Sequence, residues 1–157
     1  MTVHLELSEA MRDLHLRMHR MLNQTLKGQG ASLAQSKLLH FIERGQSVRS
    51  IDISDAFGFA PRTVTEAVDA LERDELARRD PDPNDRRAKR ISITEKGRSV
   101  LRETDPSRQA FVSSVFGVLT RAEEAELVRL LQMLNARLVE MGAPNPYGDG
   151  GPAATSG

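Results

Sequence analysis

The fold is decided by residues 61–97, PRTVTEAVDALERDELARRDPDPNDRRAKRISITEKG. The part up to Arg73 predicts a helix, and Pro61 suits its first turn, where a missing N–H costs nothing. At 100° per residue, one side of this helix carries Val64, Ala67, Val68 and Leu71. The opposite side carries Arg62, Thr65, Glu66, Asp69 and Arg73. The apolar side should therefore pack on a core, and the polar side should face solvent or a ligand.

A β-hairpin is expected next in the chain. Two short β-prone runs, 76–79 and 89–93, flank the sequence Asp80-Pro81-Asp82-Pro83-Asn84-Asp85, which is dense in residues that favour turns. Four basic residues follow this tip: Arg86, Arg87, Lys89 and Arg90. Most charge runs are only solvated loops, so a functional role for this one depends on the helix beside it.

Three helices are expected before this stretch. Residues 5–27 carry Leu7, Met11, Leu14, Met18 and Met21 at spacings of three and four, and Gly28 and Gly30 end the run. Ser32 and Gln35 fit a capping box at the start of a helix that Gly45 stops. A short helix at 49–57 offers Ile51 and Phe57 as core candidates, with Gly58 as the turn residue after it.

Two helices and a tail are expected after the hairpin. Thr94 can cap a helix over 95–118, which Pro106 should kink or interrupt. Thr120 and Glu123 form a second capping box, which opens a leucine-striped helix to 141. Residues 143–157 contain hardly any large apolar side chains and are expected to be a disordered tail.

This order of elements predicts a mainly α fold with a small β-hairpin, a winged helix-turn-helix flanked by dimerisation helices. We expect a single domain over 1–142, with the winged helix-turn-helix at 31–94 and dimerisation helices at 5–30 and 95–141. The flanking helices carry apolar faces too long for so small a module to cover. A partner chain is therefore expected.

Composition excludes several classes of protein. Without cysteine, the chain has neither a disulfide framework nor a thiolate metal site. No apolar run approaches the roughly 18 residues of a membrane span, and the N-terminus lacks a signal pattern, so a cytoplasmic protein with no membrane partner is expected. No Gly-rich phosphate loop or nucleophile elbow is present, so no enzyme is expected. The 22 basic and 22 acidic residues cancel, so any nucleic-acid role depends on where the charges lie.

The helix at 61–73 is a candidate for reading double-stranded DNA. A tight helix-turn-helix presents the first residues of its second helix to the major groove, which here are Arg62, Thr63 and Thr65. Arg can bridge the acceptors of guanine, and Thr can bond a base edge or pack on a thymine methyl. Glu66 has two open interpretations, because it can accept a hydrogen bond from cytosine or pair with a neighbouring Arg. The alternative without any DNA-binding role is an ordinary amphipathic surface helix.

The hairpin is the second candidate contact with DNA. An arginine at the tip of a projecting hairpin fits the narrow minor groove, where the negative potential is enhanced. We expect Arg87 to be the inserted residue and Arg86 to contact phosphate, with Lys89 in the same basic cluster. Three residues are expected to support this arrangement: Asp85 by orienting an arginine through a charge-assisted bond, Asp69 by pairing with a hairpin arginine, and Arg90.

Several segments together resemble the MarR family of transcriptional regulators. They are Arg62-Thr63-Val64-Thr65, Val68-Asp69-Ala70-Leu71-Glu72, Asp82-Pro83-Asn84-Asp85-Arg86-Arg87-Ala88-Lys89-Arg90, Ile93-Thr94-Glu95-Lys96-Gly97, and Leu119-Thr120 with the four residues after it. The resemblance covers about residues 5–141, and its hairpin motif is the most specific part. It implies a homodimer joined through the first, fifth and sixth helices, a palindromic operator, and release by a small molecule, often a phenolic or aromatic acid. Three residues depart from the family pattern: Glu75 replaces a usual turn glycine, Ala60 a capping Ser or Thr, and Glu66 a frequent basic residue.

The resemblance also implies a pocket for the effector, in a crevice between the dimer helices and the DNA-binding part. By analogy it would fall near Arg12, His15, Met18, His40, Phe41 and Phe111, although plain core or dimer packing is the simpler explanation for each of these. Arg12 or Arg49 could meet an effector carboxylate. His15 and His19 have the spacing of metal ligands, but no third ligand is evident, so no metal and no other cofactor is expected.

The leading hypothesis is thus a DNA-binding regulator, with repression as the expected sign. A winged-helix module that binds another protein instead of DNA is the second hypothesis, favoured by the zero net charge and Glu66. A small-molecule scaffold or enzyme is the third, and it lacks any recognisable catalytic group.

Overall fold

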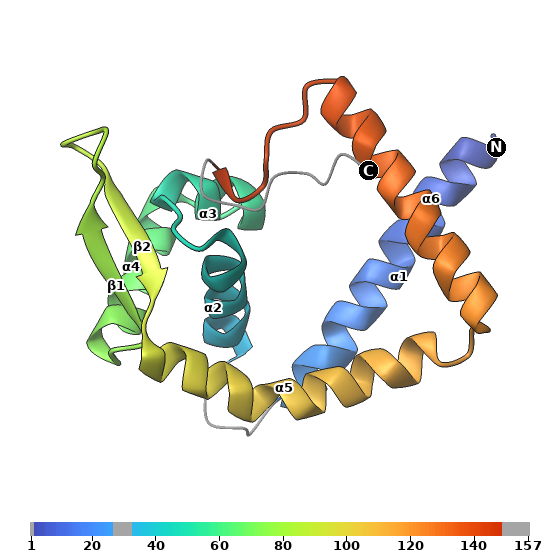
Figure 1. The fold of residues 1–157 in the computed structure, drawn as a ribbon, viewed down its shortest axis with the longest axis horizontal. Helices are drawn as coiled ribbons and strands as arrows, with labels where there is room; N and C mark the ends of the chain where they lie inside the picture. The colour runs from blue at the N-terminus through green and yellow to red at the C-terminus, as the bar shows by residue number, and fades with distance from the viewer. Residues whose placement is uncertain (1, 27–32, 149–157) are drawn as a thin grey trace.

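A computed structural model describes residues 2–26 and 33–148 of the chain (Figure 1). Six helices and one hairpin follow one another in the expected order. Their bounds are α1 Val3–Leu26, α2 Leu33–Gly45, α3 Ser50–Phe57, α4 Pro61–Arg73, β1 Ala77–Pro81, β2 Lys89–Ile93, α5 Glu95–Phe116 and α6 Arg121–Glu140. The mainly α fold with a winged helix-turn-helix is thereby confirmed.

One hydrophobic core joins α2, α3, α4 and the hairpin, and we call these elements together the hairpin lobe. Val64, Val68 and Leu71 of α4 are fully buried in this core, as the helical spacing predicts. Leu39 and Ile42 of α2 are buried with them. The lobe core further contains Leu38, Val48, Ile53, Leu76, Ala77, Ile91, Ile93 and Leu101.

The hairpin is antiparallel, with a register that runs from Ala77 opposite Ile93 to Pro81 opposite Lys89. The second strand lies where the sequence predicts it. The first strand begins one residue later and ends two residues later than the predicted 76–79. It begins later because the Leu76 N–H donates to the Leu71 carbonyl at 2.8 Å, so Leu76 belongs to the turn after α4.

A single residue pair outside the hairpin also pairs with β2. Val48, in the loop after α2, forms an isolated bridge to Ile91, with N–H to carbonyl distances of 3.0 and 2.7 Å in the two directions. Both side chains are fully buried. The hairpin is therefore anchored to the loop between α2 and α3 as well as to α4.

The short helix α3 corrects one core prediction. Ile51 is 54% exposed, whereas Ile53 is fully buried. The two residues lie about 200° apart around the helix axis, so only one can face the core. Phe57, four residues after Ile53, shares its side and packs against the core as predicted.

Two predictions about the last two helices have different outcomes. The Thr120–Glu123 capping box at the start of α6 is confirmed, with Thr120 N–H to Glu123 Oε2 at 2.8 Å and Glu123 N–H to Thr120 Oγ1 at 3.2 Å. Pro106 does not interrupt α5, which continues through it and changes direction near its middle in Figure 1. Gly28, Gly30 and Ser32, with the capping box expected at Ser32, lie outside the described residues.

The helices α1 and α6 lie at the end of the molecule opposite the hairpin, and α5 runs along the base between the two ends (Figure 1). No residue of α6 is buried, and in α1 only Leu26 is. Large apolar side chains are exposed along both helices: Leu5, Leu7, Met11, Leu14, Leu16 and Met21 on α1, and Val128, Leu130, Leu131, Met133, Leu134 and Leu138 on α6.

The first part of the expected disordered tail contacts the hairpin lobe. The Tyr147 ring lies 5.0 Å from the Phe41 ring, centroid to centroid, and the Arg44 guanidinium lies 5.8 Å from the Tyr147 centroid. One aromatic residue thus places residues 143–148 against α2, which composition alone did not predict. The rest of the tail, 149–157, lies outside the described residues.

Candidate nucleic-acid interface

The start of α4 is exposed and follows a tight turn. Gly58 ends α3 in the left-handed conformation, with φ 68°, and Pro61 opens α4 after an extended Ala60. Ala60 provides no side-chain cap, as its identity predicts. Arg62, Thr63, Thr65 and Glu66 are all exposed on the first turns of this helix.

Three of these four side chains are already engaged within α4. The Arg62 Nε donates to Glu66 Oε1 at 3.1 Å, so the carboxylate has one of the two partners considered for it. The Thr65 hydroxyl donates to the Pro61 carbonyl at 3.0 Å. Because that bond uses the hydroxyl hydrogen, Thr65 offers its methyl group and an acceptor to any ligand.

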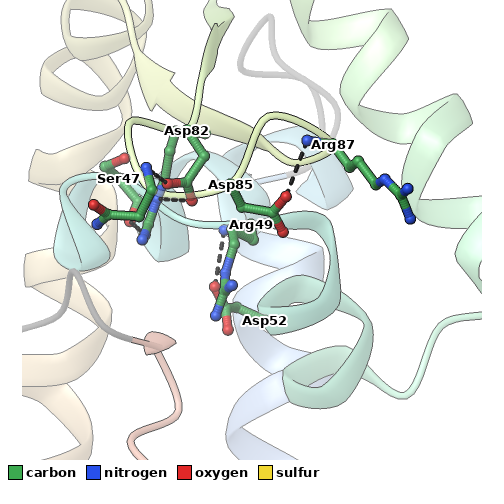
Figure 2. Close-up of polar contacts among 8 residues, drawn as sticks. Ser47, Arg49, Asp52, Asp82, Asp85 and Arg87 are labelled. Atoms are coloured by element: carbon green, nitrogen blue, oxygen red, sulfur yellow. Dashed lines mark hydrogen bonds and ion pairs between the residues drawn. The ribbon is translucent and has the colours of Figure 1, made fainter.

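The basic tip of the hairpin is also exposed, including Arg86, Arg87 and Lys89. Asp85 accepts the backbone N–H of Arg87 at 3.0 Å. The contact is therefore a local turn and not the expected bond to a guanidinium. Figure 2 shows the Arg87 side chain extending away from the Asp85 carboxylate, which leaves its charged end at the surface.

Arg90 and Asp82 form a buried link at the base of the tip. Arg90 Nε donates to Asp82 Oδ2 at 2.9 Å, and Arg90 Nη1 donates to the Ser47 carbonyl at 3.2 Å. Asp82 also accepts the Asn84 N–H at 2.8 Å. That backbone bond, with the nearby Arg90 charge, lowers the pKa of Asp82 below its ordinary value. Arg90 thus connects the hairpin to the loop after α2.

A second link joins the hairpin to α4. Arg79 Nη1, on β1, lies 2.8 Å from Asp69 Oδ1 and 3.5 Å from Glu72 Oε2. The expected pairing of Asp69 with a hairpin arginine is therefore present. The sequence did not indicate which arginine it would be, because the alternation of β1 side chains depends on a register that only the structure supplies.

These parts meet around one surface hollow of about 620 Å³. Its lining comes from the start of α3, from α4, from β1 and from the hairpin tip. The lining residues are Arg49, Ser50, Ile51, Thr65, Asp69, Arg79, Asp85, Arg87, Ala88 and Lys89. We call this the α4–hairpin surface. The polar side of α4 and the basic side of the tip therefore open on the same side of the molecule.

The six residues expected near an effector lie on three helices. Arg12, His15 and Met18 are on α1, His40 and Phe41 on α2, and Phe111 on α5. His40 Nε2 lies 3.8 Å from Asp105 Oδ1. The Phe41 ring contacts those of Phe57 and Tyr147. A second hollow is lined by Arg49, α3 and the segment 144–148, and none of the six residues lines either hollow.

The histidine pair on α1 has a basic neighbour. His15 and His19 have ring centroids 6.2 Å apart, and the Lys37 Nζ lies 2.6 Å from His19 Nδ1. Burial and the Lys37 charge lower the pKa of His19. Among the described residues, no three His, Cys, Asp or Glu side chains come together as metal ligands. Within the same residues, no helix has the length and apolar character to cross a membrane.

Known proteins resemble this chain in sequence and in fold. Residues 31–89 match the model of the MarR family. The transcriptional repressor MprA of Escherichia coli is 29% identical over 121 residues, which are 76% of this chain and 69% of MprA. Among solved structures, BpsR of Bordetella bronchiseptica, studied for the regulation of its DNA binding by 6-hydroxynicotinic acid, is 25% identical, with 83% and 98% of the two chains covered and a TM-score of 0.65.

A further structure matches at the level of the fold. It is a cysteine-to-serine mutant of MarR from E. coli, complexed with operator DNA, which is 22% identical, with a TM-score of 0.62 over 85% of this chain and 99% of that one. The relatives named here are regulators and not enzymes. The matched segment contains the whole helix-turn-helix and most of the hairpin, so sequence and fold both place the similarity of this chain with the MarR family of transcriptional regulators.

Proposed function

We propose that this protein is a sequence-specific DNA-binding repressor that acts as a homodimer on a palindromic operator and is released by a small aromatic or phenolic acid. The observation that carries the proposal is the α4–hairpin surface, where Thr65 of α4 and Arg87 and Lys89 of the hairpin line one hollow. A helix in the major groove and a hairpin in the adjacent minor groove must open on the same side of the protein. The winged helix-turn-helix would occupy residues 31–94.

The residues of the α4–hairpin surface and three exposed residues outside it, Arg62, Thr63 and Arg86, have separate roles in the proposal. Arg62, Thr63 and Thr65 face base edges, where their side chains can discriminate sequence. Arg87 enters the minor groove, and Arg86 and Lys89 contact phosphates. The Arg79–Asp69 pair holds the hairpin in place relative to α4, and the bond from Arg90 to the Ser47 carbonyl holds it to the loop after α2. The Arg90–Asp82 pair joins the two sides of the hairpin at the base of the tip.

The homodimer is supported by the apolar residues exposed on α1 and α6. An α-helix of 20 residues with no buried side chain does not form stably by itself in water, and tertiary packing usually supplies the missing stability. Leu130, Leu134 and Leu138 recur at a spacing of four, which gives α6 a continuous stripe to pack on a second copy. An isologous pair then presents two α4 helices to two half-sites.

The effector is proposed from the family relation. BpsR is described with 6-hydroxynicotinic acid, an aromatic acid. The candidate residues on α1, α2 and α5 lie on helices that contact one another, since Lys37 of α2 reaches His19 of α1 and His40 of α2 reaches Asp105 of α5. A ligand among these helices would act on the connection between the dimer helices and the hairpin lobe.

The test is selection of bound sequences from random duplex DNA, followed by affinity measurements on the selected duplex. An inverted repeat with half-sites about 10 base pairs apart, or a multiple of that distance, is expected, with two chains per duplex by sedimentation. Affinity should fall steeply with salt, as it does when phosphate counterions are released. Addition of aromatic acids, 6-hydroxynicotinic acid among them, should weaken binding.

Arg87→Ala should weaken binding to the selected duplex by about 10-fold or more, which corresponds to the loss of one well-placed base or groove contact. Arg102→Ala removes the same charge from exposed α5, outside the α4–hairpin surface, and is the matched control. If selection returns no enriched sequence and Arg87→Ala binds like the wild type, the protein-interaction module is the better description.

A further inference from the structure

The ion pair between Arg62 and Glu66 contributes little to the stability of the fold. The two side chains are 90% and 66% exposed, and exposed pairs of this kind are weak. Its order is also the less favourable one on a helix, with the cation N-terminal to the anion. Arg62 further places a positive charge at the positive end of the helix dipole. Stability therefore does not account for this pair.

The geometry of the pair constrains the arginine. Glu66 engages Nε, at 3.1 Å, which is the side nitrogen of the guanidinium. Within the described residues, the terminal nitrogens Nη1 and Nη2 of Arg62 make no hydrogen bond or ion pair. Because the guanidinium is rigid and planar, holding Nε fixes the plane of the fork. Such a fork matches the two acceptors that guanine presents in the major groove.

The other carboxylates of α4 are committed elsewhere. Asp69 and Glu72 both pair with Arg79 of the hairpin. Glu66 is thus the one acidic side chain of α4 that bonds to a residue expected to read bases. A carboxylate near DNA phosphates is repelled, so its presence on this surface weakens every complex in which Arg62 does not compensate for it.

We propose that Glu66 is a specificity-determining residue of the DNA-binding surface. It positions Arg62 for a guanine, and its charge disfavours duplexes that lack this guanine. The inference depends on the proposed function, since it assigns a role within the same surface. It concerns a residue at which the chain differs from the usual basic residue of its family.

The test compares Arg62→Ala, Glu66→Ala, Glu66→Gln and the double variant Arg62→Ala/Glu66→Ala with the wild type. Selection on the wild type and on Arg62→Ala identifies the guanine position, which is the one whose preference disappears. Affinity is then measured on the selected duplex, on the same duplex with that base pair replaced, and on random duplex. Glu103→Ala removes a carboxylate from exposed α5 and is the control.

The wild type should prefer the guanine duplex by about 10- to 100-fold. Glu66→Ala should reduce this preference to about 3-fold or less and should bind random duplex several-fold more tightly, since a repelled charge is gone. Glu66→Gln keeps an acceptor for Nε, so it should retain more of the preference while also binding random duplex more tightly. In the Arg62→Ala background, Glu66→Ala should change the preference no further.

Three outcomes would overturn the inference. If Glu66→Ala keeps the full guanine preference, the pair does not position Arg62. If Arg62→Ala loses no preference while Glu66→Ala loses one for cytosine, Glu66 reads a base directly and is not a positioning residue. If the wild type shows no sequence preference at all, the proposed function fails together with this inference, and that result is distinct from the first two.

Discussion

Gly97, in the first turn of α5, should be hard to replace even by alanine. A Cβ at this position would lie 2.2 Å from the Leu76 carbonyl oxygen and 2.7 Å from Ile93 Cγ1. To regain van der Waals separation, the start of α5 and the turn after α4 would have to move apart by roughly 1 Å. The Leu76 carbonyl also accepts the Thr94 N–H at 3.0 Å, so this movement strains that bond.

The expected cost of Gly97→Ala follows from these contacts. Overpacking a tight site costs about 1–3 kcal/mol, and a weakened hydrogen bond costs about 1 kcal/mol more. Replacing glycine by alanine within a helix stabilises the folded state by about 0.5–1 kcal/mol. The net destabilisation is therefore about 1–3 kcal/mol, which in a chain of this length lowers Tm by roughly 3–10 °C.

Thermal and urea unfolding, followed by circular dichroism, measure this change. Lys96→Ala is the matched control, because its side chain is 59% exposed and makes only a 3.6 Å ion pair with Glu75; it should change stability by less than about 0.5 kcal/mol. If Gly97→Ala proves as stable as the wild type or more so, helix propensity outweighs the close approach, and the packing argument for this corner is refuted.

Two further predictions concern charge. Arg79→Ala should weaken binding to the selected duplex by about 5-fold, because the hairpin loses its link to Asp69. The control is Arg78→Ala, which removes a 65% exposed side chain outside the α4–hairpin surface and should change the affinity by less than about 2-fold. Equal effects of the two variants would mean that only the loss of a positive charge matters. Burial and the Arg108 charge lower the pKa of His40, so the folded protein resists protonation and stability should fall as pH drops below about 6.5, where the unfolded chain binds the proton first. Between about pH 6.5 and 5, the free energy of unfolding should fall less steeply in His40→Gln than in the wild type or in the control His4→Gln. An unchanged pH profile would contradict this role for His40.

Local sequence patterns were sufficient for most of the fold. The 3.6-residue period of α4 identified Val64, Val68 and Leu71 as core, and the structure buries all three completely. Thr120 and Glu123 located the start of α6 because a capping box needs only two side chains three residues apart. Features of this kind depend on neighbours within one helical turn.

Features that depend on distant residues were not predicted. The identity of the hairpin arginine that meets Asp69 depends on strand register, and the bridge of Val48 to Ile91 joins residues 43 positions apart. The choice of Ile53 over Ile51 depends on which side of α3 faces α4, and both sides of that short helix carry an isoleucine. Such choices are made by tertiary packing and not by propensity.

The turn after α4 shows how one residue can depart from its family without changing the fold. Glu75 adopts φ 60°, in the left-handed region where glycine is usual. A non-glycine residue there costs about 1 kcal/mol. The adjoining contacts hold it, since Thr94 Oγ1 donates to the Glu75 carbonyl at 2.6 Å and the Leu76 N–H returns to Leu71. The sequence indicated the departure but not whether the turn would tolerate it.

The contact of Tyr147 with Phe41 attaches the hairpin lobe to the segment that follows α6. The other contacts of α2 named above lead to α1 and α5, through Lys37 and His19 and through His40 and Asp105. A change in the angle between the lobe and α6 must therefore carry residues 143–148 along or separate the two aromatic rings. The distance between the Tyr147 and Phe41 rings thus reports on the orientation of the lobe relative to the last helix.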